Sequence, residues 1–392
     1  MYISNLKLKN FRNYTNLNLD LYKGPMLIVG HNGAGKSNLL ESLYMLAIAK
    51  PHRSRLDREC ISWDDNEGPK FAEITGDIKK SGRNLGVKVS IYSEIASITQ
   101  NKSTNQYKPL QNYKKTLTVN GVNYQLSQFI GQVNVVLFDA EDMKLVYGAP
   151  SIRRKFIDIC VSQADSNYFK LLQAYNNILA NRNKLLKSLR HGDSKQDEII
   201  FWDNQLVEHG SYLIHKRHEV INFMNPLINR IFKAILSNQE QIGIDYSPNN
   251  KVLSYGSLEE IKSTFLSRLK ENYLQDVSQG FTTVGPHRDD IDIIMNQNKA
   301  ALFASRGQAR SIALSFKLAQ AEYIQNVSKE KPIILLDDVF AELDKDRKLF
   351  VMSKIIEYEQ IIVTTSDITQ VPEEFLESIR VLEVSNGIIN SN

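Results

Sequence analysis

The sequence predicts an α/β fold in which a P-loop sheet and an antiparallel β lobe carry a short α-helical arm. The first observation is the octapeptide Gly30–Ser37, which follows the apolar run Met26–Val29 and precedes apolar residues at helical spacing. The second is a helical period between about 160 and 235. The third is a late apolar run, Pro332–Asp338, which ends in two carboxylates. Together they predict a nucleotide-binding sheet interrupted by a helical insertion.

The octapeptide matches the phosphate-binding pattern G-x-x-x-x-G-K-S. Glycines let backbone N–H groups turn inward, and the N-terminus of the following helix adds partial positive charge. Lys36 is placed to reach the β- and γ-phosphates, and the Ser37 hydroxyl to ligate Mg²⁺. A glycine-rich turn that binds nothing is the alternative, but the strand, the Lys-Ser pair and the helix are all present. The candidate nucleotide-binding residues here are Gly30, His31, Asn32, Gly33, Ala34, Gly35, Lys36 and Ser37.

Composition limits the class of protein. The chain has 392 residues, enough for two domains, and a formal net charge of +4, too small to indicate nucleic acid by itself. Cys60 and Cys160 lack zinc or redox spacing, which favours reduced thiols in a cytoplasmic protein. The N-terminus lacks the pattern of a signal peptide, and no apolar run approaches the ~20 residues that span a bilayer. We therefore expect a cytoplasmic protein without a membrane partner.

The N-terminal half is predicted to be rich in β-structure. Alternating apolar residues at 2–11 and 17–21 predict a hairpin with one buried face, with Arg12 and Asn13 at its turn. Arg12 is either a surface charge or a contact to phosphate or base. The polar segment 94–115 predicts an exposed loop. Further strands are expected at Phe71–Ile78, Leu85–Tyr92, Leu117–Val122 (with an Asn120-Gly121 turn) and Val133–Phe138.

The helical region predicts an arm. One apolar stripe runs from Tyr168 to Leu189 and a second from Trp202 to Leu227, with a break at Gly192-Asp193-Ser194. These stripes favour an antiparallel pair of helices, each about 40–60 Å long at 1.5 Å per residue. We therefore expect three parts in the chain: 1–150 and 276–392 as the two halves of an ATPase head, and 151–275 as the arm.

Three basic clusters are candidates for contact with nucleic-acid phosphates, with solvated surface charge, or chance placement at the start of a helix, as the alternative. One follows the P-loop helix, between Lys50 and Arg58. Another, Arg153-Arg154-Lys155, falls in the first turn of a helix for which Ser151 is the candidate N-cap; cations there oppose the helix dipole. The third lies on the arm and comprises Lys184, Lys187, Arg190, His191, Lys195, Lys216 and Arg217.

The C-terminal part supplies further candidate site residues. Ser305-Arg306-Gly307-Gln308 precedes an apolar-periodic helix, and 281–293 predicts strand, turn and strand. Asp337 is placed to hold Mg²⁺, and Asp338 to orient or activate an attacking water, as phosphoryl transfer requires. A strand with a polar tip is expected at Ile361–Asp367. A P-loop kinase would have no role for the Ser-Gly-Gln segment or for the two carboxylates.

In this order, the P-loop, the Ser305 segment and the strand that ends in Asp337-Asp338 resemble the ABC-type ATPase heads of chromosome-maintenance and repair proteins. The resemblance implies that Ser305, Gly307 and Gln308 close over the γ-phosphate of ATP bound by a second copy. It therefore implies an ATP-bridged homodimer with two nucleotides at a two-fold interface.

The chain also resembles, from its first residues to its last strand, the RecF family of bacterial recombination and replication-repair proteins. The Gly-Pro-His-Arg-Asp-Asp and Ser-Arg-Gly-Gln motifs are particular to that family, and the short arm fits it. The segments that carry the resemblance are Asn10–Tyr14, Gly30–Glu41, His52–Ser54, Arg153–Asp158, Gly285–Asp290 and Ser305–Arg310.

The resemblance implies a weak, DNA-stimulated ATPase that dimerises with ATP and binds gapped DNA and junctions of single and double strands. With RecR and RecO it would help to place RecA on DNA coated by single-strand-binding protein. Arg12 and Asn13 would lie near the nucleotide. Asp338 stands where ABC ATPases usually have Glu, and Thr365 or Ser366 stands where they have a switch His. These two departures predict slow turnover.

Two other classes of ATPase stay open. A transporter-driving subunit would have a Leu-Ser-Gly-Gly-Gln signature and a switch His, and the sequence has neither. A nuclease-associated head, or the head of another SMC-like repair complex, would need a long coiled coil or a metal-rich nuclease domain, and no His/Asp cluster indicates the latter. A Q-loop glutamine is also missing, since Gln132 precedes its strand.

Overall fold

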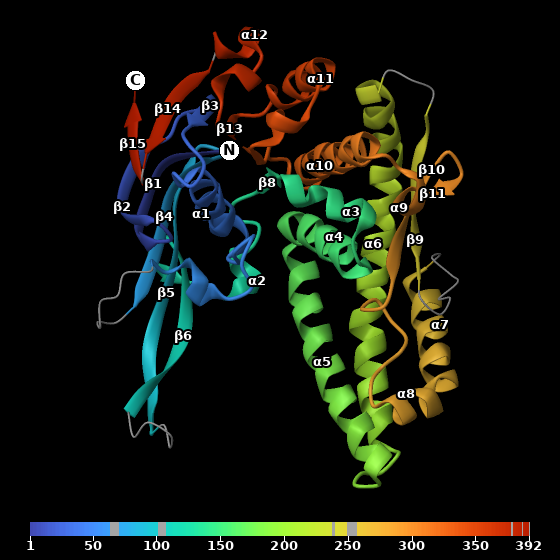
Figure 1. Cartoon of the computed structure of the whole chain (residues 1–392). Coiled ribbons are helices and arrows are strands. Elements are labelled where there is room, and N and C mark those ends of the chain that lie inside the picture. Colours follow the sequence, from blue (N-terminus) through green and yellow to red (C-terminus); the bar gives the residue numbers. More distant parts are fainter. Residues whose placement is uncertain are drawn as a thin grey trace. The chain divides into compact units, whose positions relative to one another are not determined.

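The computed structural model describes residues 1–62, 70–100, 107–236, 240–248, 257–377, 379–385 and 387–391. These residues form two compact units (Figure 1). One joins the two ends of the sequence, Met1–Ala140 and Lys329–Asn392; the other is the continuous segment Glu141–Ser328. We call them the sheet unit and the helical unit. The functional division expected from the sequence, with boundaries at 150 and 275, stays a prediction.

The sheet unit contains a largely parallel sheet in the order β15-β14-β3-β13-β12-β8. Its central strand β3 pairs in parallel with β13 on one side and with β14 on the other, while β15 is an antiparallel edge strand. Carboxyl ends of parallel strands lie at one edge of a sheet, so the loops after β3, β12, β13 and β8 meet there. The strands are β3 (Gly24–Val29), β8 (Val135–Phe138), β12 (Ile333–Asp337), β13 (Gln360–Thr365), β14 (Arg380–Ser385) and β15 (Ile388–Ser391).

The same unit contains an antiparallel lobe in the order β2-β1-β4-β5-β6-β7. The predicted N-terminal hairpin and the Asn120-Gly121 turn are confirmed, the turn by positive φ at both residues. The loop predicted at 94–115 is wrong, because β5 and β6 extend into this segment, as far as the pair Gln100↔Tyr107; 101–106 lie outside the described residues. Backbone ladders need no apolar side chains, so a polar segment can lengthen a hairpin. The strands are β1 (Tyr2–Phe11), β2 (Tyr14–Asp20), β4 (Phe71–Lys80), β5 (Arg83–Gln100), β6 (Tyr107–Val119) and β7 (Val122–Asn123).

Helix α1 (Lys36–Ile48) packs between these two sheets, against β4 and β5 on one side and β8, β12 and β13 on the other. Gly76 of β4 permits this approach, since a Cβ there would lie 2.6 Å from Leu46 Cδ1. The helix ends at Ala49 with φ of 54°, two residues before Pro51. Short helices complete the unit: η1 (Asp57–Cys60), α2 (Leu126–Phe129), η3 (Val339–Glu342), α11 (Lys345–Ile355), η4 (Ile368–Gln370) and α12 (Glu373–Leu376).

The helical unit is built on an antiparallel pair of long helices, α5 (Ser166–His191) and α6 (Glu198–Leu236), which confirms the predicted arm (Figure 1). At 1.5 Å per residue they are about 39 and 58 Å long. Gly192, with φ of 79°, ends α5. Helix α6 also packs against α7, α10 and β9. The remaining elements are η2 (Ala140–Met143), α3 (Lys144–Tyr147), α4 (Pro150–Ala164), β9 (Ile242–Ser247), α7 (Leu258–Glu271), α8 (Tyr273–Gln279), β10 (Asp290–Met295), β11 (Asn298–Lys299), α9 (Ala300–Phe303) and α10 (Arg306–Ser328).

A buried arginine ties three elements of this unit together. Arg182 of α5 is fully buried and donates to Asp203 of α6 and Asp276 of α8, each at 2.7 Å. The strand predicted before the turn in 281–293 is wrong, because side chains bind the backbone donors there. Thr282 N donates to Asn183 Oδ1 and Thr283 N to Asp276 Oδ1, so the segment does not enter a sheet. Only its second half forms a strand, β10.

His287 links the family motif to the arm, and we predict from its environment that the helical unit loses stability in mild acid. Its Nδ1 faces Tyr175 Oη at 2.7 Å and its Nε2 faces Thr282 O at 3.1 Å. Burial, assisted by neighbouring arginines, lowers the pKa of His287 from 6.5 to about 4. The unfolded chain therefore binds more protons between these values, and stability falls as pH drops from 6.5 toward 4, by about 2 kcal/mol at pH 5. Urea unfolding at pH 7 and pH 5 measures this loss, and His287→Gln should reduce the difference.

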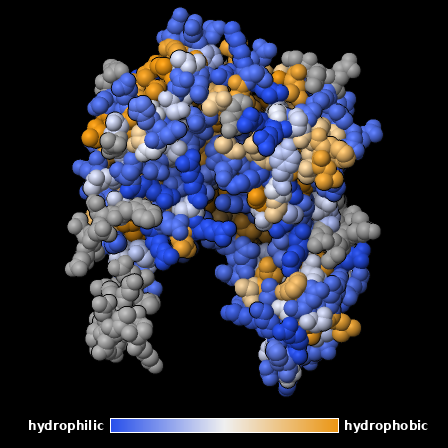
Figure 2. Space-filling view, in the orientation of Figure 1, coloured by the Kyte–Doolittle hydropathy of each residue, from blue (hydrophilic) through white to orange (hydrophobic). Residues whose placement is uncertain are grey.

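The surface and the thiols are unexceptional. Hydrophilic residues dominate the face shown in Figure 2, and apolar residues form separate patches. In the described part of the chain, no helix combines the length and hydropathy needed to cross a membrane. Cys60 and Cys160 are buried and form no disulfide; burial raises the pKa of the Cys60 thiol to about 12. Neither thiol is therefore reactive at neutral pH.

Candidate nucleotide-binding site

The P-loop leaves β3 and is braced by the first hairpin. Gly33 and Gly35 have φ of 83° and 116°, which points backbone N–H groups into the loop as an anion-binding nest requires. Asn13 Nδ2 donates to Ala34 O at 3.1 Å, and Tyr14 Oη donates to Gly35 O at 3.0 Å. A Cβ at Gly35 would lie 2.5 Å from Asn13 Nδ2, so only glycine fits. The structure thus places Asn13 against the P-loop; its expected place near the nucleotide stays a prediction.

Lys36 opens α1 with its ammonium folded over the loop. Its Nζ donates to Gly30 O at 2.6 Å and to His31 O at 3.0 Å. Burial lowers the pKa of Lys36, while the carboxylates of Asp338 and Asp337 oppose that shift. Two loop carbonyls therefore hold the cation beside the loop, and the charges of two carboxylates act on it.

Ser37 and Asp337, 300 residues apart in sequence, meet in space. Ser37 Oγ donates to Asp337 Oδ1 at 2.9 Å, and Thr364 Oγ1 donates to the same oxygen at 2.8 Å. Asp337 is only 7% exposed. Hydroxyl and carboxylate oxygens are the donors that Mg²⁺ takes, usually with water and phosphate completing the shell. The described residues contain no cluster of three or more His, Cys, Asp or Glu suited to a metal, and the Mg²⁺ site at Ser37 and Asp337 stays a prediction.

Asp338 follows β12 in the left-handed region, with φ of 54°. Its backbone N donates to Thr364 O and Oγ1, both at 3.2 Å. Asp338 is exposed, and its charge acts on Lys36. Its expected role, orienting a water toward a phosphate, stays a prediction. Thr365, the other expected departure, instead donates from Oγ1 to Asp367 O.

Sequence reasoning offered the loop that follows α1 only as a basic cluster and missed the carboxylates that it binds. Buried Glu41 accepts from the backbone N of His52 and of Arg53, both at 3.1 Å. The loop then lays His52 Nε2 2.5 Å from Asp139 Oδ2, and Arg53 Nη2 2.5 Å from Asp337 Oδ2. These carboxylates end neighbouring strands, since Phe138 pairs with Leu336. Only three-dimensional pairing joins them, so no local sequence signal could find the network.

Arg12 belongs to this network. Its Nε donates to Glu41 Oε2 at 2.9 Å, Nη2 to Ser54 Oγ at 3.1 Å and Nη1 to Glu59 O at 2.6 Å. All three donor groups of Arg12 thus bind protein atoms, and the side chain organises the loop. A role toward the nucleotide stays a prediction for Arg12.

We predict that Glu41→Gln lowers the free energy of unfolding by about 1–2 kcal/mol. The amide oxygen can still accept from the two backbone N–H groups, but the charge that binds Arg12 is lost. Chemical denaturation measures the effect. Glu73→Gln is the matched control, because Glu73 pairs with Lys88 in a half-exposed bridge on the β lobe and should cost less. Equal losses in the two variants would contradict the organising role of Glu41.

The structure corrects two of the basic candidates. Arg153 is buried, binds both oxygens of Asp290 at 2.8 Å and donates to Leu145 O and Gly148 O. It fastens α4 to β10, so the phosphate contact expected from its helix position is wrong. Arg217 of the arm is also buried, with Asp158 as its ion-pair partner. Ser151 is not the N-cap either, since α4 begins at Pro150 after Ala149.

The Ser305 segment forms a capping box at the start of α10. Gln308 N donates to Ser305 Oγ at 3.2 Å, and Ser305 N donates to Gln308 Oε1 at 2.8 Å. Gln308 Nε2 also donates to Glu240 Oε1. Ser305 itself is exposed. The motif therefore has a local role, starting a 23-residue helix, beside any role toward a nucleotide.

Comparison with known proteins decides the family. The family described as RecF/RecN/SMC N terminal domain matches residues 2–390. DNA replication and repair proteins RecF of Bacillus thuringiensis (strain Al Hakam) and Bacillus cereus (strain B4264) are 35% identical over 392 residues, covering 100% of this chain and 98% of theirs. The chain belongs to the RecF family. This membership argues against the transporter-driving and kinase alternatives.

Solved RecF structures have the same fold over the whole chain. The recombination mediator protein RecF-ATPrS of the RecFOR pathway superposes with a TM-score of 0.86 at 28% identity, covering 100% of this chain and 98% of that one. The RecF-ATP structure gives 0.86 at 27% identity, with 100% and 97% covered. An Smc head domain from Pyrococcus furiosus gives 0.52 at 16% identity and shares the fold. The predicted ABC-type head with a short arm is thereby confirmed for this RecF-family chain.

Proposed function

We propose that this chain is an ATP-gated DNA-binding protein of recombinational repair and replication restart, acting in the cytoplasm. An ATP-bridged homodimer binds DNA at gaps and at junctions of single and double strands. With RecO and RecR it promotes the loading of RecA, and slow, DNA-stimulated hydrolysis of ATP releases the dimer. Similarity to RecF proteins over the full length of the chain supports this assignment.

The contact of Ser37 with Asp337 is the observation that carries the proposal. It joins a phosphate nest to a carboxylate strand, and Ser37 and Asp337 would hold Mg²⁺ between them. The bound ion would supply positive charge against the phosphate oxygens. Lys36 would bind the β- and γ-phosphates, and Asp338 would orient the attacking water. Arg53 would have to release Asp337 Oδ2 when this oxygen is needed.

An exposed apolar pair beside Ser305 supports the dimer. Leu302 and Phe303 of α9 are 75% and 65% exposed, and Tyr147 Oη donates to Ala304 O just before the motif. Large apolar side chains that are left in water next to a functional motif mark an interaction surface. A second copy of this chain that brings its nucleotide to Ser305 would cover them.

We predict that Phe303→Asp weakens ATP-dependent dimerisation by at least about tenfold. A charge buried at the interface would lack a partner, whereas Phe303 contributes apolar area. Sedimentation with ATP measures the dimer dissociation constant. Leu274→Asp is the control, since Leu274 of α8 is 79% exposed in the same unit but lies away from α9 in sequence. The same dimer constant in both variants would argue against this surface.

The remaining DNA-contact candidates are the exposed cations that the fold does not use. They include Lys50, Arg55 and Arg58 after α1, and Lys184, Lys187, Arg190 and Lys195 on the arm. If phosphate contacts dominate, affinity for DNA should fall steeply with salt and depend little on base sequence.

Anisotropy of labelled gapped DNA over a protein titration tests the proposal, with ATP, with ADP and with Lys36→Arg. Tight binding with ATP alone, lost in Lys36→Arg and second order in protein, is the expected result. Lys23→Arg, which changes an exposed lysine of the same unit, should behave as the unaltered chain does. Equal binding in all conditions would refute nucleotide gating. A turnover number at or above ~10 s⁻¹ would refute slow hydrolysis.

A further inference from the structure

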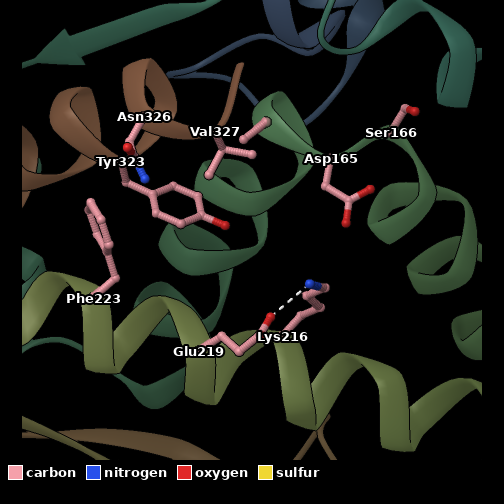
Figure 3. Close-up of a pocket in the computed structure, with 9 residues that line it drawn as sticks. Asp165, Ser166, Lys216, Glu219, Phe223, Tyr323, Asn326 and Val327 are labelled. Atoms are coloured by element: carbon pink, nitrogen blue, oxygen red, sulfur yellow. Dashed lines mark hydrogen bonds and ion pairs between the residues drawn. The ribbon is translucent and has the colours of Figure 1, made fainter. Parts of the chain in front are cut away.

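A cavity of about 410 Å³ lies within the helical unit, between the end of α4, the middle of α6 and the last turns of α10 (Figure 3). It contains none of the residues assigned above to the nucleotide, the metal ion or the dimer. The inference drawn from it therefore does not rest on the proposed function, and its test can fail without affecting that function.

One wall of the cavity is aromatic. The rings of Phe223 of α6 and Tyr323 of α10 meet edge to face, with centroids 5.5 Å apart and planes at 71°. Val327, one turn after Tyr323, is 42% exposed and extends the apolar wall to the surface. Such a wall accepts the aliphatic stem and the flat face of a long side chain.

A tyrosine hydroxyl lines this space. Tyr323 is 8% exposed, and it is one of the residues that form the wall of the cavity. Figure 3 shows the ring crossing the cavity with its hydroxyl directed toward the side where Asp165 and Lys216 lie. A phenolic hydroxyl both donates and accepts hydrogen bonds, so a ligand in the cavity can bond to it.

The charged groups on the walls sum to one negative charge. Asp165 and Glu219 are acidic, and Lys216 Nζ donates to Glu219 Oε2 at 2.7 Å. Asp165 caps α5 and accepts from Tyr212 Oη. Each carboxylate oxygen has two lone pairs, so both groups can accept further donors. Burial raises the pKa of Tyr323, and Cys160, Asp165 and Glu219 add to this shift.

We propose that this cavity binds an arginine side chain that a basic segment of a partner protein inserts between α6 and α10. The guanidinium would donate to Asp165, Glu219 and the Tyr323 oxygen, and its plane would lie against the aromatic wall. Arginine suits the site better than lysine, because a planar fork of five donors matches several acceptors at once and stacks on rings. Phosphate-bearing ligands are disfavoured, since two carboxylates line the cavity.

Binding of three fluorescent hexapeptides to the full chain, without nucleotide, tests this inference. The probes are hexaarginine, hexalysine and hexacitrulline; citrulline has the shape of arginine without its charge. We expect hexaarginine to bind at least about tenfold more tightly than hexalysine, and hexacitrulline not to bind. Similar affinities for the arginine and lysine peptides, or binding of hexacitrulline, would overturn the assignment.

Variants locate the binding. Glu219→Gln and Tyr323→Phe should each weaken hexaarginine binding by about tenfold. Glu208→Gln is the matched control, because it removes the same charge from an exposed position of α6 outside the cavity and should leave affinity unchanged. Thermal unfolding of each variant shows that the chain remains folded. Unchanged affinity in both cavity variants would place the peptide elsewhere and refute the proposal.

Discussion

Replacing Asp338 with Asn should lower the rate of ATP hydrolysis by at least about 100-fold and leave nucleotide binding intact. The amide keeps the size of the side chain, and Asn tolerates the left-handed φ of 54° found at this position. It cannot take a proton or attract one from the attacking water. ATP-bridged dimers should therefore accumulate, and release from DNA should slow in proportion.

Single-turnover hydrolysis and equilibrium nucleotide binding separate the two effects of Asp338→Asn. Asp346→Asn is the control, because it removes an exposed carboxylate from the first turn of α11 in the same unit. Hydrolysis within a few-fold of the unaltered rate would show that Asp338 is not the water-orienting group. Loss of nucleotide binding would show that Asp338 helps to bind the nucleotide before the reaction begins.

Gly285→Ala should destabilise the helical unit by at least about 3 kcal/mol. Gly285 has φ of +128°, which an L side chain rarely adopts. A Cβ there would lie 2.7 Å from Tyr175 Oη and 2.8 Å from Phe265 Cζ, and both side chains are almost fully buried. The methyl group would have to displace the ring that binds His287. The loss should therefore exceed that of an ordinary strained glycine.

Denaturant unfolding followed by Trp202 fluorescence, in a Trp63→Phe background, measures the effect on α6 directly. Gly192→Ala is the matched control, since Gly192 has φ of +79° but a Cβ there would meet no atom within 4 Å. It should cost about 1 kcal/mol from backbone strain alone. Equal losses at the two glycines would show that the core relaxes around Gly285.

The parallel sheet and the paired helices were predictable because their signals are local. An apolar run such as Ile333–Leu336 is recognisable as a strand because two carboxylates follow it directly. The 3.6-residue period of the arm continues for many turns. The segment at 94–115 was not predictable in the same way. The two strands in this segment form because each pairs with the other through backbone hydrogen bonds, and a polar sequence gives no pattern from which such pairing can be predicted.

The candidate site also contains residues that the sequence could predict and residues that it could not. Motif spacing predicted Lys36, Ser37 and Asp337 as site residues, and the structure places these three together. It could not reveal that Arg153 is committed to Asp290, because 137 residues separate the two and either charge alone suggests a surface. The role of Glu41 could not be predicted for a different reason. Four N–H groups donate to its carboxylate, and they come together only when α1 packs in the folded chain.

The position of β3 at the centre of its sheet determines the order in which the chain can fold. Both of its neighbours, β13 and β14, come from residues 360–385, so the P-loop strand has no hydrogen-bonded partner while the ribosome makes the first nine-tenths of the chain. Glu141–Ser328, by contrast, is continuous and can fold as it emerges. A nascent chain arrested before residue 360 should therefore contain a folded arm and no nucleotide site. ATP binding thus becomes available only when synthesis is almost complete, and truncated products cannot compete for the nucleotide.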